Sequence, residues 1–130
     1  MRILAIDHGV ARAGCAISDP SETLARPLAV VEPPDPAAVA RLASDEGAEL
    51  VVVGLPVTLG GEHGAQAEAA LRFRDELAEV MQVPVETYDE RLTTRMAGET
   101  ARAGARAPAD ALAAAHLLES YLHARAGGVQ

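Results

Sequence analysis

Aromatic residues are almost absent from this 130-residue chain, which has no tryptophan, one phenylalanine and two tyrosines. So few rings argue against an aromatic platform of the kind on which single-stranded nucleic acids stack their bases. The chain also has a single cysteine, Cys15, which excludes an internal disulfide and a zinc site of several cysteines. We therefore expect a core of Val, Leu, Ile and Ala, with Cys15 as one of its small members.

Long apolar runs are missing as well. No segment approaches the about 18 apolar residues that a transmembrane helix needs, and Asp7 interrupts the apolar N-terminal run before any signal-peptide cleavage site. These features predict a cytoplasmic protein with no membrane partner. The length fits one domain, which we expect to span residues 1–125 and to be followed by a flexible C-terminal tail at 126–130.

Positive charge is scarce, and lysine is absent. All 11 basic residues are arginines, against 19 acidic residues, and the formal net charge is −8. This balance argues against a protein that is held on nucleic acid by bulk positive charge. One locally basic stretch stands out between residues 91 and 106, and because the guanidinium fork suits phosphate, it is a candidate contact for nucleic acid. Its arginines are Arg91, Arg95, Arg102 and Arg106.

Apolar runs and turn residues predict the element order β-β-β-α-β-α-β-α-α. Strands are expected at 2–7, 11–18, 23–31, 49–55 and 83–88, and helices at 36–46, 65–81, 93–103 and 108–124. The first three strands are closely linked and should form an antiparallel meander, with Pro27 placing the third strand at an edge. Helical crossovers imply that the first, fourth and fifth strands run parallel. The predicted α/β fold is therefore a five-stranded mixed sheet, an antiparallel meander plus two parallel strands, flanked by helices.

Acidic side chains occur where predicted strands end. Asp7 ends the first strand, and Asp89 and Glu90 follow the fifth. Ligands of open α/β sheets collect at the carboxyl ends of the strands. One acid at such a position usually forms a turn or caps a helix. Acids at two such positions on a small sheet favour a functional cluster more strongly than either acid does alone. Strand alternation does not decide whether Asp89 or Glu90 faces Asp7.

A third acid, Asp110, lies in the first turn of the last predicted helix, where it also suits the helix dipole. Residues 114, 117, 118 and 121 on the same helical face are Ala, Leu, Leu and Tyr. We therefore expect Asp110 to point toward the core, where a carboxylate needs an Arg, backbone amides or a shared metal as partner. His116 and His123 fall on outer faces of this helix, and no pair of histidines has the spacing of a zinc motif.

Three converging carboxylates suggest a site for a hard cation. Oxygen ligands suit Mg²⁺ or Mn²⁺, which usually complete their coordination with water and substrate phosphate. Two ions about 4 Å apart can activate water and hold the leaving oxygen during phosphodiester cleavage. A metal site would also reconcile the net negative charge with binding of nucleic acid, because acids that bind metal repel nucleic acid only when the metal is absent.

Several segments resemble motifs of the YqgF/RuvX family, in the same order. Residues 5–9 (AIDHG) and 12–19 (RAGCAISD) are similar to the family opening GIDxGxxRIGVAxSD, and further matches are ARPL at 25–28, VVGLP at 52–56, DERLTT at 89–94 and DALAAA at 110–115. The likeness extends from residue 2 to about residue 122. Two departures bear on nucleic-acid binding: the connector 102–108 is short and has no lysine, and the Asn common after Gly-Leu-Pro is replaced around Val57 and Thr58.

The resemblance implies an RNase H-like fold and a nuclease that matures the 5′ end of pre-16S ribosomal RNA. By resemblance, Asp7, Glu90 (chosen over Asp89) and Asp110 are the catalytic acids that bind Mg²⁺ or Mn²⁺. The expected nucleic-acid contacts are those that the resemblance implies together with those of the basic stretch. They are Arg12, Arg91, Thr93, Thr94, Arg95, Arg102 and Arg106.

The leading hypothesis is thus a metal-dependent nuclease that acts on structured RNA. One alternative has the same chemistry but resolves branched DNA, since the family is related to the RuvC Holliday-junction resolvases. Two matched cuts then require a homodimer instead of a monomer. A second alternative is a ribosome-assembly factor that binds nucleic acid with little catalysis. The sequence leaves RNA and DNA both open, because discrimination at the 2′-OH depends on groove shape.

Overall fold

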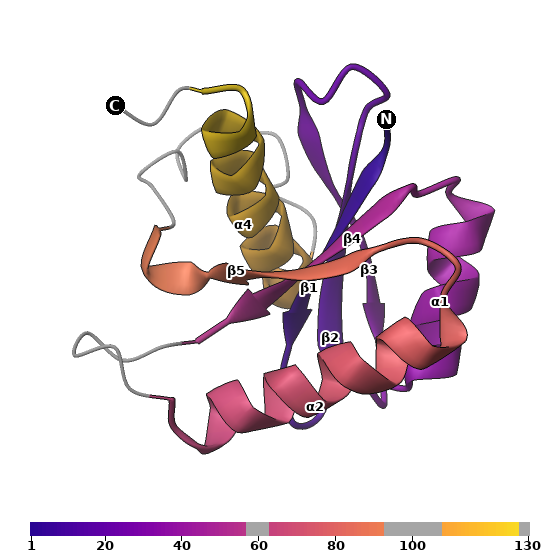
Figure 1. The fold of residues 1–130 in the computed structure, drawn as a ribbon, viewed down its shortest axis with the longest axis vertical. Helices are drawn as coiled ribbons and strands as arrows, with labels where there is room; N and C mark the ends of the chain where they lie inside the picture. The colour runs from indigo at the N-terminus through magenta and orange to yellow at the C-terminus, as the bar shows by residue number, and fades with distance from the viewer. Residues whose placement is uncertain (57–62, 93–107, 128–130) are drawn as a thin grey trace.

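The computed structural model describes residues 1–56, 63–92 and 108–127 (Figure 1). In chain order its elements are β1 (Ile3–His8), β2 (Ala13–Ser18), β3 (Ala25–Val31), α1 (Pro36–Asp45), β4 (Leu50–Leu55), α2 (Ala65–Val80), β5 (Val85–Asp89), the 3₁₀ turn η1 (Glu90–Leu92) and α4 (Ala109–Arg125). The strands and helices predicted at these positions are confirmed, with ends that shift by one or two residues. The helix predicted at 93–103 and residues 128–130 of the predicted tail lie outside the described residues.

The five strands form one mixed sheet in the order β3-β2-β1-β4-β5. β1, β2 and β3 pair antiparallel, β4 pairs parallel with β1, and β5 pairs parallel with β4. This is the predicted meander with two added parallel strands. Pro27 lies in β3 at the sheet edge, which suits a residue that has no backbone N–H to donate to a ladder.

Local sequence explains where these elements begin and end. The Asp35 side chain caps α1 by accepting a hydrogen bond from the Ala38 amide at 3.3 Å, and Pro36 occupies the first helical position. Gly47 follows the helix with φ +70°, a conformation that glycine adopts without strain. In β4, residues 50–53 are buried on both faces, as their unbroken run of Leu and Val predicts.

Helices cover both faces of the sheet (Figure 1). Among the described helices, α1 and α2 pack on one face and α4 packs on the other. Side chains alternate along β1: Leu4 and Ile6 face α1 and α2, whereas Ile3 and Ala5 face α4. The same alternation directs Asp7 to the α4 face. Cys15 is fully buried on the α1 and α2 face, as expected of a small core residue, and no helix among the described residues is long and apolar enough to cross a membrane.

Candidate active site

Asp7 is flanked by glycine on both neighbouring strands. Its register partner on β2 is Gly14. On β4, Gly54 follows Val53, which is the register partner of Ile6, so that Gly54 stands level with Asp7. Because neither glycine has a side chain, other elements can approach the backbone closely on both sides of Asp7.

Gly14 makes room for the start of α4. A Cβ atom built on Gly14 would lie 2.0 Å from the carbonyl oxygen of Asp110 and 2.3 Å from its carbonyl carbon. The first turn of α4 therefore rests on the backbone of β2, which brings Asp110 beside Asp7. The Asp110 side chain is 44% exposed, so the expectation that it points into the core is wrong. It lies in the first turn of the helix, and the buried residues of α4 begin only at Ala111.

Gly54 makes room for Glu90 in the same way. A Cβ atom on Gly54 would lie 2.7 Å from Glu90 Oε2 and 2.9 Å from Leu117 Cδ2. β5 ends at Asp89, and the 3₁₀ turn that starts at Glu90 directs these adjacent acids differently. The Asp89 carboxylate accepts hydrogen bonds from the Arg91 amide at 2.9 Å and from Arg91 Nη2 at 2.6 Å. Glu90, in contrast, lies over Gly54 and toward Asp7.

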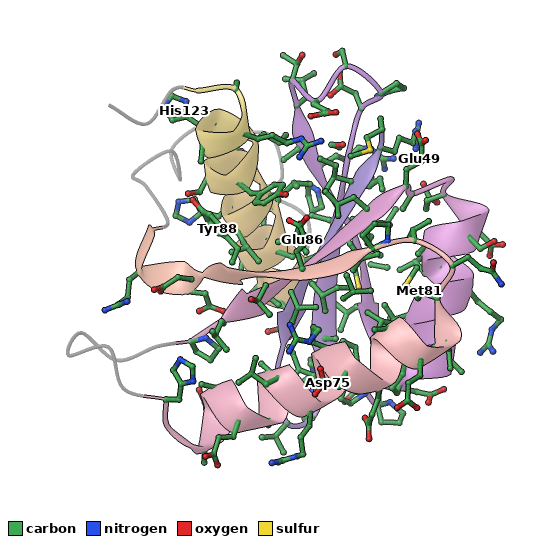
Figure 2. All side chains as sticks on the ribbon, viewed as in Figure 1. Glu49, Asp75, Met81, Glu86, Tyr88 and His123 are labelled. Carbon is green, nitrogen blue, oxygen red and sulfur yellow. The ribbon has the colours of Figure 1, made fainter. Side chains whose placement is uncertain are left out.

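Two tyrosines tie β5 to α4 and so fix the end of this strand. The Tyr88 hydroxyl lies 2.9 Å from the Ser120 hydroxyl, and the Tyr121 hydroxyl donates a hydrogen bond to Glu86 at 2.8 Å. The two tyrosine rings meet edge to face, with centroids 5.4 Å apart. Figure 2 shows Glu86 and Tyr88 on β5 where it passes α4. These contacts hold the strand that leads into Glu90 against the helix that carries Asp110.

Burial and mutual repulsion make two of the acids easier to protonate. Burial raises the pKa of Asp7, and the negative charge of Asp110 raises it further. Burial also raises the pKa of Glu90, with smaller contributions from Asp7 and Asp89. Hydrogen bonds from the Arg91 side chain instead lower the pKa of Asp89. Asp7 is therefore the shared neighbour of two other acids, and a cation among them would relieve the repulsion.

A cavity of about 280 Å³ opens beside these groups and is lined by Asp7, Glu90, Ala113, His116 and Leu117. The expectation that His116 lies on an outer face of the helix is therefore wrong. The prediction for His116 was based on the helical face that carries Asp110, whereas the cavity lies to one side of that face and includes His116. A larger cavity, of about 560 Å³, lies between the C-terminal ends of α1 and α2. Among the described residues that line it, Glu49 is the single carboxylate, so these residues do not provide the paired acids of the smaller cavity.

The acids suit a hard divalent cation in their chemistry. Within the described parts of the chain, no three Asp, Glu, His or Cys side chains converge into a complete metal site. A complete set is not required, because Mg²⁺ is usually held by one or two carboxylates and keeps water and substrate phosphate as its other ligands. Asp7 with Glu90, or Asp7 with Asp110, provides such a pair of carboxylates. The residues present therefore fit Mg²⁺ or Mn²⁺.

Two of the predicted nucleic-acid contacts lie close to these acids. Arg12 Nη1 is 3.7 Å from Asp110 Oδ2, and its Nη2 is 3.4 Å from Glu32 Oε2. Arg91 is paired with Asp89, as described above, and both arginines remain partly exposed to solvent. The other predicted contacts all lie outside the described residues. They are Thr93, Thr94, Arg95, Arg102 and Arg106.

Comparisons with known proteins place the chain in a family. The family model RuvX, described as Holliday junction resolvase, matches residues 1–124. A curated relative from Chloroflexus aggregans, with the name "Putative pre-16S rRNA nuclease", is 45% identical over 95% of this chain and 94% of its own length. A relative of the same name from Rubrobacter xylanophilus is 42% identical over 97% of this chain and 95% of its own length.

Solved structures share the fold. RuvC of Thermus thermophilus in complex with a Holliday junction substrate aligns with a TM-score of 0.71 and 20% identity, over 98% of this chain and 96% of that chain. The fowlpox virus resolvase in complex with Holliday junction DNA aligns with a TM-score of 0.59 and 13% identity, over 96% of this chain and 99% of that chain. The predicted RNase H-like fold is thereby confirmed. The chain belongs to the RuvX (YqgF) family, a family of nucleases.

Proposed function

We propose that this protein is a divalent-metal-dependent nuclease that cleaves structured RNA and processes the 5′ end of pre-16S rRNA. The observation that carries the proposal is the position of Asp7, which shares a cavity with Glu90 and is electrostatically coupled to both Glu90 and Asp110. The names of the curated relatives support the choice of substrate. Because the proposed substrate is a ribosomal RNA precursor, we expect the protein to act in the cytoplasm.

In this proposal Asp7, Glu90 and Asp110 hold Mg²⁺ or Mn²⁺ as two pairs of carboxylates that share Asp7. A bound ion of this kind lowers the pKa of a water molecule for attack and offsets charge on the phosphate. The protein's part is to keep the carboxylates close together in a half-buried site. Gly14 and Gly54 allow this by admitting the start of α4 and the Glu90 side chain. Burial raises the pKa of Asp7 and of Glu90, and the charges of neighbouring acids raise it further. A bound cation would offset the repulsion between these charges.

Arginines at the rim of the site would position the substrate backbone. Arg12 and Arg91 each pair with a carboxylate next to the site and are partly exposed. Each would exchange that carboxylate for a phosphate oxygen of the substrate, a geometry that the guanidinium fork accepts equally well. The basic stretch would add further contacts along the strand. These contacts would come from Thr93, Thr94, Arg95, Arg102 and Arg106.

A second candidate function is the resolution of branched DNA. The description of the family model and the likeness to RuvC on a Holliday junction favour it. Resolution requires two matched cuts and therefore a homodimer with two active sites. Light scattering at the protein concentration of the cleavage assay distinguishes this candidate from a monomeric RNA nuclease.

The deciding experiment compares three labelled substrates: a precursor rRNA fragment with its 5′ extension, an unstructured RNA and a four-way DNA junction. Each is incubated with Mg²⁺, with Mn²⁺ and with EDTA. We expect metal-dependent cleavage of the precursor fragment, with Mn²⁺ at least as effective as Mg²⁺ because it tolerates looser geometry. Full cleavage in EDTA would refute the metal-dependent mechanism, and preferential cutting of the junction would favour the second candidate.

A matched pair of variants ties the cleavage to this site. Asp7→Asn removes the central acid, whereas Asp75→Asn changes an acid on α2, which packs on the opposite face of the sheet (Figure 2). We expect Asp75→Asn to cleave like the parent and Asp7→Asn to lose activity. Equal activity in the two variants would show that the cleavage arises elsewhere.

A further inference from the structure

The cavity beside Asp7 and Glu90 contains one side chain that the proposed mechanism does not use. Among the described residues that line it, Asp7 and Glu90 are acidic, and Ala113 and Leu117 are apolar. His116 is the remaining residue. Within this described part of the lining, it is the one side chain that carries an N–H group.

A phosphodiester in this cavity would need such a donor. Its oxygens carry negative charge and would meet the carboxylates of Asp7 and Glu90 on the sheet side, where only a cation can make the contact favourable. On the helix side, Ala113 and Leu117 offer no hydrogen bond. Among the described residues on the helix side of the cavity, His116 is the one that could offer a phosphate oxygen a hydrogen bond, and unpaired polar groups are costly in a confined site.

The backbone that carries His116 is packed against the sheet. Its neighbours Ala115, Leu117 and Leu118 are buried against the sheet, and Ser120, one turn further on, meets the Tyr88 hydroxyl. His116 is half-buried and lies six residues beyond Asp110, which corresponds to about 9 Å along the helix axis. The imidazole and the Asp110 carboxylate would therefore meet different parts of a bound strand.

Two observations favour a phosphate contact over a metal contact for this histidine. No three Asp, Glu, His or Cys side chains converge on one point within the described parts of the chain, so His116 does not complete a metal site with Asp7 and Glu90. Mg²⁺ also prefers oxygen ligands, whereas imidazole suits softer ions such as zinc and nickel. A hydrogen bond to the substrate uses the imidazole without either difficulty.

We propose that His116 is a substrate-contacting residue of this site, whose imidazole N–H donates a hydrogen bond to a phosphate oxygen of the nucleic acid beside the cleaved bond. The inference rests on the proposed nuclease function and deepens it. It assigns a role to a residue of α4 that lies outside the three acids, and it predicts that loss of the donor weakens productive binding of the substrate without weakening the binding of metal.

The test uses the full chain with His116→Ala, His116→Asn and His116→Gln, and His123→Ala as matched control. His123 is an exposed histidine toward the C-terminal end of the same helix (Figure 2). KM and kcat are measured on the precursor rRNA fragment at saturating Mg²⁺, and Mn²⁺ affinity is measured by electron paramagnetic resonance without nucleic acid. We expect His116→Ala to lower kcat/KM about tenfold, a loss that corresponds to one charge-assisted hydrogen bond.

A phosphate contact, a metal ligand and a purely structural residue would each give a different result. For a phosphate contact, Mn²⁺ affinity stays at the parental value in His116→Ala, and either Asn or Gln, each with an amide N–H, restores most of kcat/KM. A parental kcat/KM in His116→Ala would overturn the inference, and so would a parallel loss of Mn²⁺ affinity, which would make His116 a metal ligand. A loss that neither amide restores and that accompanies a lower melting temperature would show a purely structural role and would also overturn it. If the parent and His123→Ala cleave none of the substrates, the proposed function itself fails.

Discussion

Replacing Gly14 by alanine perturbs the site while leaving every acid in place. The added Cβ would lie 2.0 Å from the carbonyl oxygen of Asp110 and 2.3 Å from its carbonyl carbon, whereas nonbonded atoms in favourable contact stay about 3.5 Å apart. Both Asp110 atoms belong to the backbone. The clash is therefore relieved only if the first turn of α4 moves away from β2 by roughly 1 Å or more, and such overpacking costs about 1–3 kcal/mol of unfolding free energy.

The same movement carries Asp110 away from Asp7. A misplacement of about 1 Å in an active site can lower the rate about 100-fold. We therefore expect Gly14→Ala to lose about two orders of magnitude in single-turnover cleavage of the precursor rRNA fragment in Mg²⁺. Urea unfolding of the same sample measures the stability loss and shows that the protein is still folded under assay conditions.

Gly64→Ala is the matched control, because a Cβ atom on Gly64 would meet nothing within 4 Å. We expect this variant to keep the parental rate and to lose no more than about 1 kcal/mol of unfolding free energy, because Gly64 is the N-cap of α2 and alanine is a poorer N-cap than glycine. A Gly14→Ala protein with parental stability and parental rate would refute the reasoning, since it would mean that α4 does not need the close approach to β2.

Glu90→Gln should abolish most of the cleavage, whereas Asp89→Asn should reduce it far less, because the Asp89 carboxylate is held by Arg91; the reverse order in a cleavage assay would make Asp89 the functional acid. As the pH falls from 7 to about 5, the metal-free parent should gain stability, since the raised pKa values of Asp7 and Glu90 make the native state take up protons before the unfolded state does. Urea titrations across this range should show a smaller gain for Asp7→Asn, and an equal gain would mean that other groups cause it. Replacing Arg102 and Arg106 by alanine should weaken RNA binding and flatten its dependence on salt, because fewer counterions are released; fluorescence anisotropy with an unchanged salt slope would place the substrate elsewhere.

Much of the fold was predictable because neighbouring residues determine its elements. The run of Leu and Val at 50–53 predicts a strand buried on both faces, and Asp35 with Pro36 predicts where α1 begins. The ends were less predictable, because hydrogen bonds in turns set them. The second strand was expected from residue 11, but the Gly9 amide donates to the Arg12 carbonyl at 2.9 Å and delays the strand to Ala13.

The candidate site was predictable in composition and less so in geometry. Asp7 and Asp110 could be selected from the sequence, because Asp7 ends the first predicted strand and Asp110 lies in the first turn of the last predicted helix. The choice between Asp89 and Glu90 depends on the turn that follows β5, which a strand pattern does not contain. The parts played by Gly14, Gly54 and His116 depend on contacts between elements far apart in the chain, so the residues around them in the sequence carry little information about them.

The substitution Asp7→Asn tests the central claim, that Asp7 is a metal ligand of a nuclease, most directly. Without metal, the variant should be as stable as the parent or slightly more stable, because it removes one charge from a cluster of repelling carboxylates. Saturating Mg²⁺ should stabilise the parent by mass action and should stabilise the variant less, and thermal melts with and without Mg²⁺ measure both effects. Cleavage of the precursor rRNA fragment, measured on the same samples, should fall by orders of magnitude. A variant that is destabilised by about 1 kcal/mol or more without metal and still cleaves at the parental rate would contradict the claim, because Asp7 would then be a structural acid.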